Sequence, residues 1–137
     1  MLEEPIRQLL KSQIGITDED INRLSPGIQK LLSAVPEAMK WKMIAEVTES
    51  KYCFAGCKVG DKFVFSGTNL IAGESTCPLC MGALAPLLER GHIMWDRIID
   101  GRDPNGLWTS HAQCYDIGVE HGGLGRVIFK VYAKKTE

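Results

Sequence analysis

The chain carries two kinds of hydrophobic pattern, and the change between them falls near residue 40. Before that point apolar residues recur three and four positions apart, as in residues 6–10, which is the spacing of one face of an α-helix. Over residues 41–48 apolar and polar side chains tend to alternate instead, which is typical of a half-buried strand. The pattern therefore predicts a helical N-terminal extension over residues 1–39 and a cysteine-bearing domain over residues 40–137.

Helix-start signals divide the N-terminal extension into short helices. Pro5 and Ser25 mark two of these starts, and Thr17, with Asp20 three positions later, forms a short-armed variant of the capping box. Short amphipathic helices cannot bury their apolar faces alone, so they have to pack on something else. We therefore expect residues 1–39 to bind a protein partner or to mediate self-association into a homo-oligomer.

The second region predicts a small β-sheet. Residues 62–65 and 126–132 repeat the alternating pattern, and a further strand is expected around residues 113–117. Together with residues 41–48 they predict a small, mostly antiparallel sheet. The fold class that follows is α+β, with one or two helices packed on the sheet and the short-helix extension preceding it.

One helix of this region is expected to begin at the second pair of cysteines. Ser75 or Thr76 provides a cap, and Pro78 would then lie in the first turn, where a missing N–H is tolerated. Pro86 is expected to kink or restart this helix, because proline removes a hydrogen bond and clashes with the preceding turn.

Composition and charge narrow the range of functions. The 137 residues include 45% hydrophobic and 24% charged side chains, with a formal net charge of -1, which is ordinary for a globular protein. Because the charge is balanced, neither nucleic acid nor an anionic membrane is an expected partner. The acidic start, residues 1–5, does not resemble a signal peptide, and no apolar run is long enough to cross a bilayer. We therefore expect a cytoplasmic protein whose thiols stay reduced.

The five cysteines are the most informative chemical feature. Their order along the chain is a C-x3-C pair, a C-x2-C pair and a single late cysteine, which are Cys53 and Cys57, Cys77 and Cys80, and Cys114. Two short-spaced pairs about one hairpin apart can bring four thiolates to one soft metal ion. The spacing therefore predicts a metal site, with zinc as the first choice and an iron–sulfur cluster as the alternative.

Three other interpretations of these residues stay open. Buried cysteines without a ligand would pack as small hydrophobic side chains. Cys77 and Cys80 at a helix start would suit a thiol redox enzyme, because a helix N-terminus favours thiolates. His111, three residues before Cys114, is a minor candidate ligand, or it could lie beside an open coordination position in a metal-dependent enzyme.

The glycine-rich stretch over residues 122–125 raises the question of a phosphate site. Phosphate-binding loops open a helix, where N–H groups and the helix dipole face the anion. This stretch precedes a strand instead, so we expect a wide hairpin loop.

The run over residues 53–61, Cys-Phe-Ala-Gly-Cys-Lys-Val-Gly-Asp, is similar to the signature of a family of small cysteine-bearing prokaryotic proteins of unknown function. The family pattern continues with a Cys-Pro at a helix start, here Cys77 and Pro78, and with a late cysteine before the final strand, here Cys114. The resemblance covers residues 41–134.

The resemblance also implies a set of metal ligands. In the family, histidine often stands at the position of Cys57, and the position of Cys80 often lacks cysteine. The implied quartet is therefore Cys53, Cys57, Cys77 and Cys114, with Cys80 as the alternative fourth ligand. The family brings no known activity. We expect a structural thiolate site in an accessory subunit or small binding protein, and the possibility of an enzyme stays open.

Overall fold

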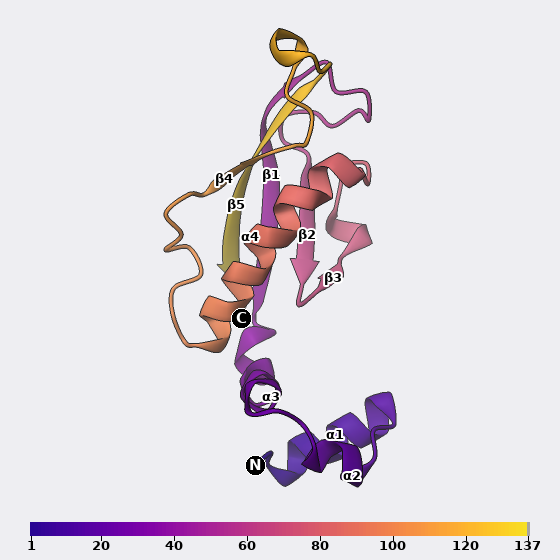
Figure 1. Ribbon diagram of the computed structural model, residues 1–137, viewed down its shortest axis with the longest axis vertical. Helices are drawn as coiled ribbons and strands as arrows, with labels where there is room; N and C mark the ends of the chain where they lie inside the picture. Colours follow the sequence, from indigo (N-terminus) through magenta and orange to yellow (C-terminus); the bar gives the residue numbers. More distant parts are fainter. Residues whose placement is uncertain (137) are drawn as a thin grey trace.

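The computed structural model describes residues 1–136, and the fold is α+β as predicted. Three short helices precede a five-stranded antiparallel sheet, and one long helix packs on a face of that sheet (Figure 1). The helices are α1 (Glu4–Ile14), α2 (Asp18–Asn22), α3 (Pro26–Ala38) and α4 (Met81–Ile99), and the 3-10 turns are η1 (Ala72–Glu74) and η2 (Val119–His121). The strands are β1 (Trp41–Lys51), β2 (Lys62–Ser66), β3 (Asn69–Leu70), β4 (His111–Gln113) and β5 (Arg126–Lys135).

The sheet has the strand order β3-β2-β1-β5-β4, and all neighbouring strands are antiparallel. Its two long central strands pair from Trp41 opposite Lys135 to Lys51 opposite Arg126. The register shifts after Val47, and an irregularity of this kind bends and twists a strand. The bend in β1 comes shortly before the loop that carries the first pair of cysteines.

The core lies between α4 and the sheet. Along β5 every second side chain from Val127 to Ala133 is buried, while those between them face the other side, as the pleat of a strand requires. At the centre, Phe63 and Phe129 are fully buried, with ring centroids 5.9 Å apart. Met94 meets this layer from α4 and is also fully buried. Burying a side chain of this size contributes roughly 1.5–3 kcal/mol, so this layer contributes strongly to the stability of the domain.

The short helices expected over residues 1–39 form at the opposite end of the molecule from the cysteine-bearing loops (Figure 1). α1 buries none of its residues. Ion pairs from Arg7 and Lys11 to Asp18, at 3.1 and 2.7 Å, hold α1 to the start of α2. α3 packs on α4 instead. No helix within the described part of the chain is long and apolar enough to cross a membrane.

The helix after the second pair of cysteines begins later than the sequence predicts. α4 starts at Met81 with Cys80 as its N-cap, rather than at Ser75 or Thr76. Both hydroxyl groups instead accept hydrogen bonds from backbone N–H groups of β2, at 3.0 and 3.1 Å. Pro78 adds to the delay, because a proline disfavours helical backbone at the residue before it.

Two further expectations are corrected. α4 does not restart at Pro86, and the expected kink stays a prediction; the Gly82 carbonyl that Pro86 leaves without its N–H accepts the N–H of Tyr115 instead. The strand expected around residues 113–117 lies earlier, as β4, His111–Gln113, because the chain after it turns toward the start of α4.

The stretch over residues 122–125 lies in the connection between the antiparallel strands β4 and β5, so the expected hairpin loop is confirmed.

Candidate functional site

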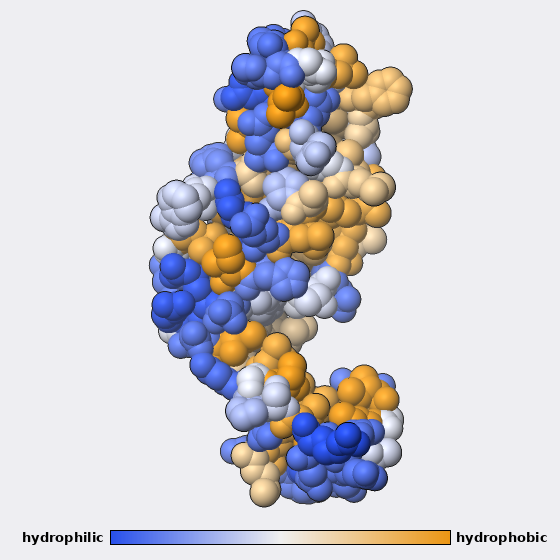
Figure 2. All heavy atoms as spheres, viewed as in Figure 1, coloured by the Kyte–Doolittle hydropathy of each residue, from blue (hydrophilic) through white to orange (hydrophobic). Residues whose placement is uncertain are grey.

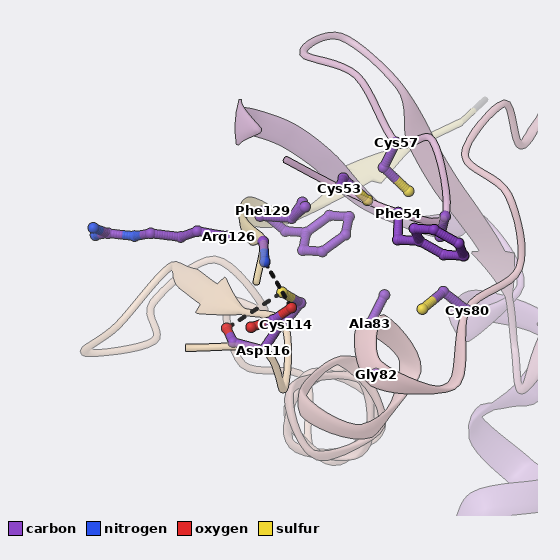
Figure 3. Close-up of a pocket in the computed structure, with 13 residues that line it drawn as sticks. Cys53, Phe54, Cys57, Cys80, Gly82, Ala83, Cys114, Asp116, Arg126 and Phe129 are labelled. Atoms are coloured by element: carbon purple, nitrogen blue, oxygen red, sulfur yellow. Dashed lines mark hydrogen bonds between the residues drawn. The ribbon is translucent and has the colours of Figure 1, made fainter. Parts of the chain in front are cut away.

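A small cavity at one end of the sheet brings the cysteines together (Figure 3). Its walls come from the loop between β1 and β2, the start of α4 and the segment between β4 and β5. The cavity has a volume of about 130 Å³. Four of the five cysteines line it, namely Cys53, Cys57, Cys80 and Cys114. Most of the remaining lining is apolar and includes Phe129 of the core.

The fifth cysteine, Cys77, is joined to Cys57 by a disulfide, with 5.3 Å between the two Cα atoms. Both side chains are buried, and their bond ties the β1–β2 loop to the extended segment before α4. Cys53, Cys80 and Cys114 are free and partly buried, and they pack against the apolar core. The disulfide therefore links the two pairs seen in the sequence, and it does not join Cys77 to Cys80, the pair expected for a thiol redox enzyme.

Cys77 does not lie at a helix start. Its backbone N–H donates to the carbonyl of Lys62 in β2, at 3.2 Å, so it belongs to an extended segment along that strand. Cys80 is the cysteine next to the helix, and its carbonyl accepts the N–H of Leu84 at 3.0 Å. The argument that a helix N-terminus activates Cys77 is therefore wrong, because α4 begins after it.

Pro86 helps to position Cys114. A proline has no N–H to donate to the carbonyl four residues earlier, which belongs to Gly82. That carbonyl accepts the N–H of Tyr115 instead, at 2.8 Å. On its other side, the N–H of Cys114 donates to the carbonyl of Val127 at 2.9 Å. The backbone at Cys114 is thus held by both α4 and β5, with the thiol at the cavity wall.

Asp116 organises the glycine-rich loop beside the cavity. Its carboxylate accepts hydrogen bonds from the backbone N–H groups of Gly118, Leu124 and Gly125, at 3.1, 2.9 and 2.7 Å. These bonds, led by that from Gly125, lower the pKa of Asp116. Gly123 has to be glycine, because a Cβ there would clash with the same carboxylate. The loop therefore encloses the protein's own carboxylate, and the sequence analysis missed this residue because it lies outside the glycine-rich stretch.

His111 does not belong to the cavity. It lies exposed on β4, where its Nδ1 is 3.1 Å from Oγ of Ser110. Across residues 1–136, no three histidine, cysteine, aspartate or glutamate side chains are close enough together to hold a metal ion in this disulfide-bonded form. The structure thus gathers the five cysteines, but the predicted quartet is not assembled while Cys57 is bonded to Cys77.

Comparisons of the chain with protein-family models, with curated proteins and with solved structures found no match. The resemblance to small cysteine-bearing proteins stays a prediction, which rests on residues 53–61, Cys77 and Cys114, although Cys77 and Pro78 lie before α4 and not at its start. The function has to be argued from the chemistry of the cavity. Thiols and a disulfide in one place permit two kinds of chemistry, which are binding of a soft metal and thiol–disulfide exchange.

Proposed function

We propose that the reduced chain binds one zinc ion at the cysteine cavity, with Cys53, Cys57, Cys77 and Cys114 as ligands and a structural role for the metal. The observation that carries this proposal is that four cysteines, from three separate parts of the sequence, line one cavity, and that the fifth, Cys77, is bonded to one of them. Four thiolates around a tetrahedral ion form a common structural zinc site. An iron–sulfur cluster, held by the same kind of ligands, is the alternative cofactor.

The predicted ligands start from favourable positions. Cys57 and Cys77 already lie side by side, with 5.3 Å between their Cα atoms. Zinc–sulfur bonds of about 2.3 Å would place two ligand sulfurs roughly 3.8 Å apart, which asks for little backbone movement once the disulfide is reduced. Cys53 and Cys114 line the same cavity. Reduction of one bond is the covalent change that the site requires.

Cys114 is a better fourth ligand than Cys80. Hydrogen bonds from its own backbone and from that of its neighbour Tyr115 anchor it to β5 and α4, so its backbone is held in place before any metal arrives. Ligands that the surrounding structure holds in place make the more precise sites. Cys80 continues the line of Ala83 and Leu87, the buried face of α4, where a thiol packs well as a small hydrophobic side chain.

A metal at this position would join three segments that the sequence keeps apart. The free energy of binding a structural zinc ion contributes directly to folding, so the metal would stabilise the loops around the cavity. We propose a cytoplasmic accessory subunit or small binding protein, because thiols stay reduced in that compartment. Residues 1–39 would then provide the contact with a protein partner or with a second copy of the chain.

Metal analysis tests the proposal directly. The protein is purified anaerobically, with a reductant and without a chelator. We expect about one zinc ion per chain, or the brown absorption of a cluster if the alternative cofactor is bound. A metal-free protein that is fully folded and has all its thiols free would contradict both.

Two cysteine variants form a matched pair for the same measurement. Cys114→Ser should release the metal and destabilise the protein strongly, because structural zinc binding is folding free energy. Cys80→Ala should keep the metal and lower the free energy of unfolding by at most about 2 kcal/mol, as a small core truncation does. The reverse result would make Cys80 the fourth ligand.

A further inference from the structure

Large apolar side chains are exposed next to the free cysteines of the chain. Four of them directly adjoin a free cysteine in the sequence, are exposed to solvent and lie outside any other pocket of residues 1–136, namely Phe54, Leu79, Met81 and Tyr115. Their exposed fractions range from 69% to 96%. Tyr52 also adjoins a free cysteine, but it lines a separate pocket with Lys51 and Glu120. Figure 2 shows apolar side chains gathered along the edge of the molecule where the β1–β2 loop and the start of α4 lie. We call these four residues the apolar rim.

Two of the rim residues, Phe54 and Tyr115, lie at or beside the cavity. Phe54 lines the cavity together with Cys80 (Figure 3). Tyr115 lies against the start of α4. Its N–H donates to the carbonyl of Gly82 at 2.8 Å, and its Cβ is 3.6 Å from the position that a Cβ on Gly82 would occupy. Met81 directly precedes Gly82 in α4. Exposed apolar side chains beside a cavity favour the binding of another molecule there.

The disulfide faces the cavity through one of its two cysteines. Cys57 lines the cavity, whereas Cys77 is not part of the cavity wall. Thiol–disulfide exchange begins when a thiolate attacks one sulfur of a disulfide and the other sulfur leaves. A thiolate that enters past the apolar rim therefore meets Cys57, and Cys77 becomes the leaving group.

We propose that the oxidised chain oxidises dithiols in extended polypeptide segments whose cysteines are flanked by apolar residues. One substrate thiolate attacks Sγ of Cys57, a mixed disulfide forms, and Cys77 leaves as a thiolate that takes up a proton. The second substrate thiolate attacks the substrate sulfur of the mixed disulfide, so that the substrate disulfide forms and Cys57 leaves as a thiolate. Two electrons pass from the substrate to the Cys57–Cys77 bond, which is reduced.

The surroundings of the cavity favour a polypeptide over a small charged thiol. The charge of Asp116 is engaged by backbone N–H groups of its own loop. The guanidinium of Arg126 points away from the cavity (Figure 3). Neither charge is presented to an incoming thiol. The apolar rim therefore dominates recognition, and an extended chain gains from it by burying its own apolar side chains.

This activity goes beyond zinc binding, because it uses the other redox state of the same cysteines. Cys57 and Cys77 cannot be bonded to each other and to a metal at once. The test is therefore made with the oxidised protein in the presence of a chelator. A failure to bind zinc then leaves the exchange measurement unaffected, and a failure of exchange leaves the metal analysis unaffected.

The probes are two synthetic peptides with the same Cys-Gly-Gly-Cys centre, one flanked by leucines and the other by serines. The rate at which each is oxidised is measured anaerobically by chromatography. We expect the leucine peptide to react at least about tenfold faster, since its flanking residues can be buried on the apolar rim. Equal rates for the two peptides would overturn the proposal.

Three variants locate the preference. Phe54→Ser and Tyr115→Ser each remove part of the apolar rim and should bring the rate for the leucine peptide down toward that for the serine peptide. Trp108→Ser is the matched control, because Trp108 is 97% exposed and does not line the cavity. It should leave both rates unchanged. An equal loss in this control would overturn the role assigned to the apolar rim.

The unmodified protein shows which cysteine sulfur the peptide attacks, and it carries no risk of a variant that fails to fold. Acid quenching during the reaction preserves mixed disulfides, and mass spectrometry identifies the cysteine that carries the peptide. We expect the leucine peptide on Cys57. Its presence on Cys53, Cys80 or Cys114 instead would overturn the assignment.

Discussion

The two ends of the molecule both expose apolar side chains, but in different chemical settings. At the cysteine end, the apolar rim lies next to a cavity of about 130 Å³ that holds three free thiols and faces a disulfide. At the helical end, α1 buries none of its residues and Ile14 is 68% exposed. The sequence places no cysteine there, and exposed ion pairs such as Lys11 with Asp18 hold the helices together. One end combines apolar contact with covalent chemistry, and the other offers contact alone.

This difference shows how exposed apolar surface should be interpreted. Beside a reactive group it can select which molecules reach that group, and its effect is then a difference in reaction rates. Without such a group it predicts assembly, and its effect is then a difference in mass. The two ends should therefore respond differently to the same kind of change.

The largest effect is expected in the layer beneath the cysteine cavity. Phe129 is fully buried, lies beside Phe63 and forms part of the cavity wall. Phe129→Ala should lower the free energy of unfolding by about 3–5 kcal/mol, because it removes apolar contacts and leaves a void. Ile14→Ala at the exposed helical end is the control and should change it by less than about 0.5 kcal/mol. Urea denaturation measures both, and similar losses would contradict the contrast between the two ends.

Removal of residues 1–22, which takes away α1 and α2, is expected to change assembly rather than stability. α3 packs on α4, and the first two helices are paired with each other through ion pairs. The sheet domain should therefore keep its thermal stability and its cysteine chemistry. The number of chains per particle, which is the mass measured by light scattering divided by the mass of one shortened chain, should fall, because the apolar face of α1 is lost. An unfolded sheet domain would show instead that these helices belong to the core.

Much of the fold could be predicted because it depends on local pattern. The alternation along β5 and the helical spacing before residue 40 are properties of each segment alone, and the corresponding elements form. The start of α4 could not be predicted in this way. The hydroxyls of Ser75 and Thr76 bind the backbone of β2 instead of capping the helix. Which partner a hydroxyl group finds depends on a strand that is distant in the sequence.

The candidate site shows the same limit. Spacing drew attention to all five cysteines, but the bond between Cys57 and Cys77 could not be deduced, since sequence alone does not fix connectivity. Asp116 was missed because the N–H groups that it binds come together only when the loop closes. Pro86 was expected to kink or restart its helix; α4 does not restart there, and the missing N–H of Pro86 leaves a carbonyl that holds the segment of Cys114.

A smaller, pH-dependent effect is expected from Asp116 at the cysteine end. Hydrogen bonds from the N–H groups of Gly125, Leu124 and Gly118 lower its folded pKa. Its contribution to stability is therefore present above the unfolded pKa of about 3.9 and is lost as the pH falls through the lower folded pKa. Asp116→Asn should melt below the wild type at neutral pH, and this gap should close in acid. Thermal unfolding of both proteins across this range measures it, and a gap that stays constant would speak against the loop being held by the carboxylate.

The smallest effect is expected where the helical end meets the sheet. Glu37 in α3 pairs with Lys40 at 2.7 Å and with Lys135 of β5 at 2.9 Å. The hydrogen bond from Lys40, followed by that from Lys135, lowers the pKa of Glu37 from 4.5 to about 2. The stabilisation from this carboxylate is present above pH 4.5 and is lost as the pH falls toward 2. Because all three side chains are in water, Glu37→Gln should change the melting temperature only slightly, and the difference should fade in high salt.

An NMR titration of the Glu37 carboxyl group measures these ion pairs directly. Its midpoint should lie near 2 in the wild type. Lys40→Ala should raise it more than Lys135→Ala does, because the hydrogen bond from Lys40 is the larger cause of the shift. A midpoint at the ordinary value in the wild type would mean that the ion pairs do not persist in solution. The link between Glu37 and β5 would then be lost, and α3 would depend on its packing against α4, while a covalent bond still closes the cysteine end.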